Sequence, residues 1–290
     1  MNTFFQRLPI FFIPKQKLIY LIGLLVCFAA CKQEPPLPEL MLTAQPNEVL
    51  AHDTSFQFVA NRPVSWQLSD SSLATISSDG LLETKTSSGV VYLHIATTET
   101  DQPISRDTIA IRISSRAPEL NKLRKGGAVI YLRHAIATVG SDQFNVAPGW
   151  HLSCNSDTAR QLAPDGRIQA QELGAAFKAL EIPISQIYVS EYCRCIQTVE
   201  EMGLELPYQT EEAITYYVYD EAQRHPNTLA FINQLVPGDQ NILVVSHSWG
   251  QGSFLPGIAQ GFSATFVPGS GAEPDYRTML RDDEWRVLVE

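Results

Sequence analysis

The sequence is poor in cysteine and in charge, and each shortage excludes a class of protein. Five cysteines in 290 residues are too few for a disulfide-rich scaffold, and no CxxC pair indicates a zinc site. Charged residues make up only 18% of the chain, whereas hydrophobic residues make up 44%. This composition excludes a disordered chain and a polybasic protein that binds nucleic acid.

Positive charge is scarcer than negative charge. The chain has 21 basic and 31 acidic side chains, which gives a formal net charge of −10. We therefore expect no general affinity for nucleic acid or for anionic lipid, and any anion site needs a local group of basic residues. The length of 290 residues suggests two domains or one large domain.

One apolar run stands near the N-terminus, at Leu18–Ala30. Its 13 residues are fewer than the roughly 20 that a membrane-spanning helix needs. Arg7, Lys15 and Lys17 precede the run, and small residues end it. A basic stretch, a short apolar core and a small-residue boundary predict a signal peptide over residues 1–30.

The end of this run, Phe28-Ala29-Ala30-Cys31, resembles a bacterial lipobox. The resemblance implies cleavage before Cys31 and lipidation of that cysteine, with the protein anchored in a bacterial cell envelope. Residues 31–40 then form a proline-rich tether to the membrane. Lys32 after the cysteine favours the outer membrane. Two alternatives stay open: an ordinary secretory signal, and an uncleaved membrane anchor.

Residues 41–115 are rich in Ser, Thr, Val and Ile and have no long helical periodicity. Short alternating runs separated by turn residues predict the strands of a small all-β sandwich. These runs are Phe56–Val59, Val64–Leu68, Val90–Ile95 and Thr108–Ile113.

Trp66, followed by Ser69–Leu82 and the turn at Gly89, resembles the bacterial Ig-like group 2 domain. That resemblance implies an Ig-like sandwich that acts as a spacer, with adhesion as the alternative. Residues 116–126 are charged, and we expect them to form a linker.

Residues 127–290 alternate between buried-strand and helical patterns, which predicts an α/β domain with helices over a mostly parallel sheet. Apolar runs predict strands, and apolar residues near helical spacing predict helices. The expected strands are Ala128–Leu132, Ile187–Val189 and Ile242–Val245, and the expected helices are Gly166–Leu180, Arg194–Met202 and Thr228–Val236.

Polar side chains follow the ends of these three strands. Arg133 and His134 come after the first strand, Arg194 follows shortly after the second, and His247 follows the third. Ligands of open α/β sheets bind at the carboxyl ends of the strands. We therefore expect two arginines and two histidines to meet at one edge of the sheet.

Four motifs in this order resemble those of the histidine phosphatase superfamily, the phosphoglycerate-mutase-like clan. They are Leu132–Ala135, Leu162–Ala170, Ser190–Thr198 and Val245–His247. The resemblance implies that His134 is a nucleophile that forms a phosphohistidine. Arg133, Arg194 and His247 would form the phosphate pocket, and Arg160 would contact phosphate or substrate, with a surface ion pair as its alternative.

The chemistry of these side chains supports such roles. Guanidinium groups bind phosphate bidentately and stay charged. A neutral imidazole can attack phosphorus if its other nitrogen donates to a fixed acceptor. A protonated His247 would stabilise charge on the phosphoryl oxygens. No metal or other cofactor is expected.

The proton donor for the leaving group is the least defined residue. The resemblance places a carboxylate near Tyr219-Asp220-Glu221, and Asp220 is our choice, although the usual surrounding pattern is absent. Relatives without such an acid act on substrates with good leaving groups.

The resemblance also places Cys154 and Cys193 near the pocket. We expect a disulfide between them, with Cys195 as the competing partner.

Features of the sequence suggest three other functions. Ser248 mimics the nucleophile of an α/β-hydrolase, but no histidine follows His247 to complete that triad. A mutase would need cytoplasmic substrates, which export removes. A catalytically inactive surface lipoprotein that acts as a binding module is the remaining alternative.

We expect an exported phosphatase that acts on a phosphorylated small molecule or surface substrate. It would be bound to the membrane through its lipid anchor and would not bind nucleic acid.

Overall fold

The computed structural model describes residues 37–100, 103–144, 148–249, 257–269 and 273–289. The predicted signal peptide and Cys31 lie outside these residues. Leu40–Glu290 form one compact unit, so the boundaries of the two predicted domains stay predictions. Every helix among the described residues is too short or too polar to cross a bilayer.

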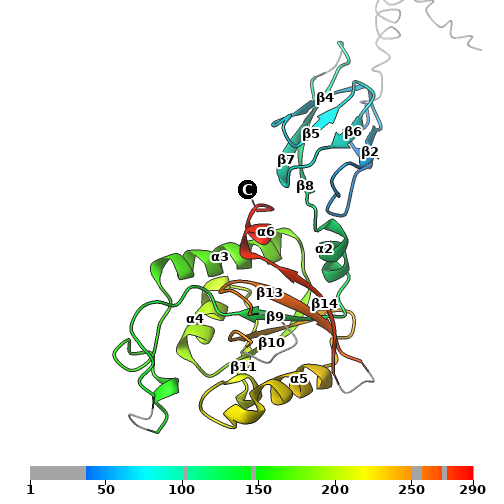
Figure 1. The fold of residues 1–290 in the computed structure, drawn as a ribbon. Helices are drawn as coiled ribbons and strands as arrows, with labels where there is room; N and C mark the ends of the chain where they lie inside the picture. Colours follow the sequence, from blue (N-terminus) through cyan, green and yellow to red (C-terminus); the bar gives the residue numbers. More distant parts are fainter. Residues whose placement is uncertain (1–36, 101–102, 145–147, 250–256, 270–272, 290) are drawn as a thin grey trace, which may run out of the picture. The chain divides into compact units, whose positions relative to one another are not determined.

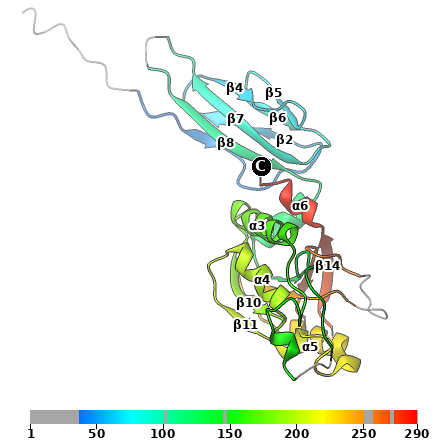
Figure 2. The ribbon, with the colours of Figure 1, turned by 90° about the vertical axis from the view of Figure 1, so that its left-hand side faces the viewer.

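The N-terminal part is all-β and antiparallel, as predicted. One sheet has the order β4-β7-β8, a second has the order β2-β6-β5, and β1 pairs with β3. The long strands β7 and β8 pair along most of their length (Figure 2). The strands are β1 (Leu42–Ala44), β2 (Ser55–Gln57), β3 (Val59–Ala60), β4 (Val64–Leu68), β5 (Ala74–Ile76), β6 (Leu81–Thr84), β7 (Gly89–Thr97) and β8 (Arg106–Ile113).

Alternation of side chains explains this part of the fold. Val91, Leu93 and Ile95 point to one face of β7 and are buried. Successive side chains of a strand point to opposite faces, so this period of two gives one apolar face. Phe58, between β2 and β3, and Leu82 of β6 join the same hydrophobic cluster.

The C-terminal part is a six-stranded mixed sheet with the order β11-β10-β12-β9-β13-β14. Strands β11, β10, β12 and β9 are parallel, whereas β13 and β14 are antiparallel to their neighbours. The strands are β9 (Val129–Arg133), β10 (Ile184–Val189), β11 (Tyr208–Thr210), β12 (Asn241–Ser246), β13 (Ser263–Val267) and β14 (Asp275–Leu280). The predicted α/β class with a mostly parallel sheet is confirmed.

Helices cover both faces of this sheet (Figure 1). In β9, Ile130 and Leu132 pack with α3 and α4, whereas Val129 and Tyr131 pack with α5 on the other face. The helices are α2 (Ala117–Arg124), α3 (Pro164–Ala179), α4 (Cys193–Met202), α5 (Arg224–Gln234) and α6 (Asp282–Arg286), with short 3-10 turns η1 (Trp150–Leu152), η2 (Glu212–Ile214) and η3 (Glu221–Gln223).

The structure contains elements that the sequence did not predict. The charged segment 116–126, expected to form a linker, contains helix α2, with Ala117, Leu120 and Leu123 buried. The sequence did not predict this helix, because charged residues at the other helical positions make the segment polar as a whole. The hairpin of β13 and β14 had no counterpart among the predicted elements.

Two glycines set the position of α3. A Cβ at Gly166 would lie 2.0 Å from the carbonyl oxygen of Ile136, in the loop after β9. A Cβ at Gly174 would lie 1.9 Å from the carbonyl oxygen of Met202, at the end of α4. Both separations are far below van der Waals contact, so α3 packs this closely only because the two side chains are absent.

We predict that Gly174→Ala destabilises the protein. Alanine in place of glycine within a helix normally stabilises by about 1 kcal/mol. Here the clash with the Met202 backbone outweighs that gain, and overpacking of this kind costs about 1–3 kcal/mol. Urea unfolding should show the loss. Lys178→Ala, an exposed substitution in the same helix, is the control and should change stability by no more than about 0.5 kcal/mol. A stabilised Gly174→Ala variant would contradict the packing described.

Candidate active site

The site lies at the carboxyl ends of β10, β12 and β9. These strands are parallel and adjacent, with Ser246 opposite Arg133 and Val189 opposite Val245. The residues that follow the three strands therefore meet at one edge of the sheet. The His134 amide donates to the Ser246 carbonyl at 2.9 Å, which ties the first strand end to the third.

His134 is buried, and a hydrogen bond defines its tautomer. Its Nδ1 lies 2.8 Å from the carbonyl oxygen of Ala135. A carbonyl only accepts, so Nδ1 carries the hydrogen and Nε2 keeps its lone pair. Burial, and then the positive charge of Arg194, hold the pKa of His134 well below its usual value. The imidazole is therefore neutral, with Nε2 available as a nucleophile.

His247 lies beside His134, with ring centroids 5.5 Å apart. Its Nε2 is 2.8 Å from the Ser190 hydroxyl. Burial and the charge of Arg194 also hold the pKa of His247 well below its usual value. The low pKa disfavours the protonated form of His247 considered from the sequence, because burial and the charge of Arg194 both oppose another positive charge there.

Arg133 and Arg194 each present an unused donor. Their Nε atoms are buried and find no hydrogen-bond acceptor among the described residues. Arg133 donates through its NH1 to the Ile258 carbonyl at 2.8 Å, and burial, followed by the charges of Arg160 and Arg194, lowers its pKa. Buried polar groups are normally paired, so two unpaired guanidinium N–H groups near each other indicate a place for an anion.

Arg194 stands in the first turn of α4, where backbone N–H groups also favour an anion. Its guanidinium carbon lies 4.1 Å from the centroid of the Tyr192 ring. Thr198, one turn later, accepts from the Ala135 amide and donates to the Arg194 carbonyl, at 3.0 and 2.7 Å. These bonds fix α4 to the loop that carries His134.

Asp142 is a site residue that sequence reasoning missed. Its side chain is 5% exposed, and its carboxylate accepts from Arg194 at 3.1 Å and from Arg160 at 3.2 Å. The Arg160 amide also donates to it, at 3.0 Å. Asp142 thus holds two arginines in place, and it puts Arg160 in an ion pair within the site. No motif marks Asp142, since it lies in a long loop after the first strand end.

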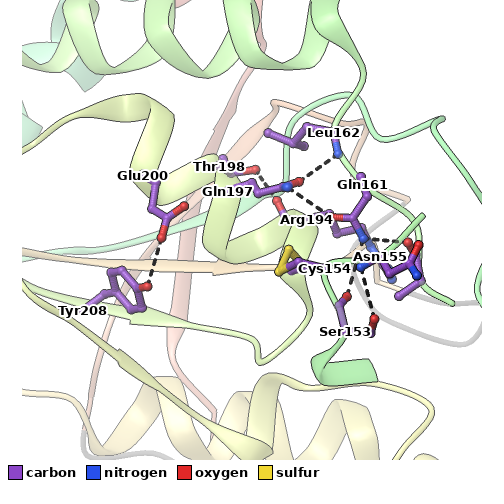
Figure 3. The surroundings of a disulfide bond; sticks show 12 residues. Ser153, Cys154, Asn155, Gln161, Leu162, Arg194, Gln197, Thr198, Glu200 and Tyr208 are labelled. Atoms are coloured by element: carbon purple, nitrogen blue, oxygen red, sulfur yellow. Dashed lines mark hydrogen bonds between the residues drawn. A yellow bond between two sulfur atoms is a disulfide. The ribbon is translucent and has the colours of Figure 1, made fainter. Parts of the chain in front are cut away.

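A disulfide joins Cys154 to Cys193, the pairing expected from the resemblance (Figure 3). It ties the loop after β9 to the residue before Arg194. Gln197 strengthens the same attachment, because it donates to Gln161 and accepts from the Leu162 amide, both at 3.0 Å. Cys195, the competing partner, is a buried free thiol whose pKa burial raises to about 12.

The predicted acid, Asp220, has an exposed side chain at the start of η3. Within the described residues no hydrogen bond or ion pair joins it to His134, Arg133, Arg194 or His247. Its role stays a prediction. No group of three His, Cys, Asp or Glu side chains in the described ranges forms a metal site.

Comparison with known sequences supports the resemblance for the C-terminal half. Residues 150–228 match the histidine phosphatase superfamily (branch 1). The match includes Arg194 and Arg160 but ends short of His247 and begins after His134. No protein of curated function matches the sequence.

Solved structures give more distant similarities. The protein histidine phosphatase SixA complexed with tungstate is 19% identical, with a TM-score of 0.39 over 54% of this chain and 97% of that one. Phosphoserine phosphatase from Entamoeba histolytica, in complex with 3-phosphoglyceric acid, is 13% identical, with a TM-score of 0.37 over 55% and 98%. At these low identities and TM-scores, the similarity says nothing about the substrate.

We predict that stability falls as the pH drops below about 6.5, partly because of the two buried histidines. Their folded-state pKa values lie below that ordinary value, so below it the unfolded chain binds more protons than the folded one. The free energy of unfolding then decreases by up to about 1.4 kcal/mol per pH unit for each histidine. Urea unfolding from pH 7.5 to 5 measures the slope.

The double variant His134→Asn/His247→Asn should show a shallower slope, and the exposed His94→Asn is the matched control. Equal slopes in the double variant and the wild type would show that the two histidines are not held neutral.

Proposed function

We propose that the protein hydrolyses phosphomonoesters through a phosphohistidine on His134. The observation that carries this proposal is the tautomer of His134. Its Nδ1–H donates to a backbone carbonyl, which leaves a neutral Nε2 beside two buried guanidinium groups with unused donors. A nucleophile and an oxyanion cradle at one strand edge are what phosphoryl transfer requires.

The charges around the pocket suit a phosphate dianion. Arg133, Arg160 and Arg194 are positive, Asp142 is negative and pairs with two of them, and both histidines are neutral. Two positive charges therefore remain to be balanced, which equals the charge of a phosphomonoester dianion. This local excess exists in a chain whose net charge is −10.

The reaction proceeds in two steps. His134 Nε2 attacks phosphorus, the bond from phosphorus to the ester oxygen breaks, and that oxygen takes a proton from solvent or an acid, for which Asp220 is our choice. Water then attacks the phosphohistidine, the P–N bond breaks, and inorganic phosphate leaves with the neutral imidazole restored. Arg133, Arg194 and His247 hold the phosphoryl oxygens through both steps.

A non-catalytic binding module is the second candidate, and the exposure of Asp220 is the observation that favours it. Without a proton donor, an alkoxide leaves poorly, and general acid catalysis contributes about 100- to 10,000-fold. The same pocket would then bind a phosphorylated ligand without turnover.

The cellular setting is also part of the proposal. The lipobox-like sequence supports a lipid anchor on Cys31 and an extracytoplasmic position in a bacterial envelope, with residues 31–40 as the tether. The antiparallel sheets of the N-terminal part are consistent with an Ig-like spacer between the anchor and the phosphatase domain.

We predict that His134→Ala lowers phosphatase activity on the order of a thousand-fold or more, because the nucleophile is removed. Release of inorganic phosphate by residues 32–290 with a chelator present measures this. Ser248→Ala is the matched control and should keep activity, since the serine follows His247 yet has no role in the mechanism. Circular dichroism checks that both variants fold.

The outcomes separate the candidate functions. Unchanged activity in His134→Ala, or its loss in Ser248→Ala, would refute the phosphohistidine mechanism. No turnover by the wild type, with phosphorylated ligand still bound, would favour the binding module.

We predict that Cys31→Ser releases the protein from membranes of a bacterial host that processes lipoproteins. Lipid attached to the cysteine supplies the anchor, and buried acyl chain stabilises membrane binding by about 0.8 kcal/mol per CH₂. Metabolic labelling with a fatty acid, followed by membrane fractionation, tests this. Cys27→Ser is the control and should retain the label. A Cys31→Ser protein that stays labelled would exclude this site of lipidation.

A further inference from the structure

A chain of aromatic contacts runs outward from His247. The rings of His247 and Tyr192 are 4.9 Å apart, those of Tyr192 and Trp150 are 5.5 Å apart, and those of Trp150 and Phe144 are 5.0 Å apart. Phe144 then contacts Tyr217 at 5.8 Å. We call Tyr192, Trp150, Phe144 and Tyr217 the aromatic wall.

The wall passes from the interior to the surface. Tyr192 and Trp150 are buried, whereas Phe144 is 51% exposed and Tyr217 is 55% exposed. A single exposed ring is ordinary on a protein surface, but exposed rings that continue a buried aromatic stack beside a polar site mark a ligand surface. The outer part of the wall is therefore open to solvent, and its inner part contacts His247 through Tyr192.

Both exposed rings are close in sequence to residues that contact the phosphate pocket. Phe144 lies two residues after Asp142, whose carboxylate pairs with Arg194 and Arg160. Tyr217 follows Tyr216, whose ring lies 5.3 Å from that of His247. Short segments thus connect each exposed ring to a residue that contacts the pocket.

The backbone of Tyr217 is strained in a way that presents its ring. Its φ is +66°, in the left-handed region that bulky residues rarely adopt. The Tyr217 amide donates to the Glu221 carboxylate at 2.8 Å, and the Arg224 guanidinium lies 5.2 Å from the ring centroid. Such strain persists where the surroundings enforce it, and it is common at ligand sites.

We propose that the aromatic wall receives an aromatic ring carried by the substrate, so that the substrate is an aryl phosphate, the phosphate ester of a phenol. This inference rests on the proposed function and names its substrate class. The phosphate lies between His134 and the arginines, and the ring packs against Phe144 and Tyr217. Aromatic pairs in edge-to-face or offset contact add to the stabilisation that burial provides.

Leaving-group chemistry agrees with this substrate class. A phenol has a pKa near 10, compared with about 15.7 for water, so phenolate leaves without full protonation. Such a leaving group does not need a general acid within the site, so the exposed position of Asp220 does not prevent catalysis. After attack by His134 Nε2, the P–O bond breaks with its electron pair on the phenol oxygen, which takes a proton from solvent. Water hydrolyses the phosphohistidine as before.

The test separates ring binding from catalysis. Calorimetry measures the binding of phenylphosphonate and propylphosphonate, which cannot be hydrolysed, to the protein with its disulfide intact. We expect phenylphosphonate to bind about 3- to 10-fold more tightly, the size of one aromatic contact. Phe144→Leu keeps an apolar side chain of similar bulk but removes one of the two rings, and it should reduce the preference. Tyr92→Ala, at an exposed aromatic residue of β7, is the matched control and should retain it.

Equal binding of the two phosphonates by the wild type would overturn the proposal, as would a preference that is undiminished in Phe144→Leu. Turnover of phenyl and propyl phosphate is measured in parallel. A ring preference in binding without turnover would refute the phosphatase mechanism and leave the aromatic wall supported. Turnover without any ring preference would support the phosphatase mechanism and refute the role of the aromatic wall.

Discussion

Arg194 carries a positive charge into the interior of the α/β half, where its side chain is 2% exposed, and the site is organised around that buried charge. A buried cation must be paired, because its desolvation is otherwise too costly. Asp142 provides the carboxylate and Tyr192 a ring face. Since Asp142 lies in the loop after β9, pairing it with Arg194 draws that loop over the start of α4. The Cys154–Cys193 disulfide holds the same two segments together by a covalent bond.

The same charge sets the chemistry of the histidines. Burial and Arg194 together hold the pKa values of His134 and His247 below their ordinary range, so neither imidazole competes with the arginines as a cation. A neutral His134 is the form that can attack phosphorus, and its bond to the Ala135 carbonyl selects the reactive nitrogen. Electrostatics therefore separates the two kinds of side chain: the arginines carry the positive charge of the site, and burial disfavours a charge on the histidines.

The residues of the site come from two kinds of segment, the strand ends and the loops that follow them. Parallel strands β10, β12 and β9 place the reacting groups on a fixed edge. The loops after these strands carry the less regular features, including the strained Tyr217 and the exposed Phe144. In the proposed function, phosphate binding depends on the residues at the strand edge, and the choice among phosphate esters depends on the residues of the loops.

The sequence alone determined the strand ends and the order of the motifs. Apolar runs such as Ile242–Val245 are short-range signals, and the residue after a buried strand has a known place in an α/β sheet. Arg133, His134, Arg194 and His247 could be grouped for that reason. Asp142, the helix at Ala117–Arg124 and the aromatic wall could not. Their significance depends on pairing, burial and ring contacts between residues far apart in the chain, and no local pattern encodes such contacts. Only the folded structure brings Asp142 to Arg194 and Phe144 to Tyr217, because loop paths are set by tertiary packing and by a buried charge that needs a partner.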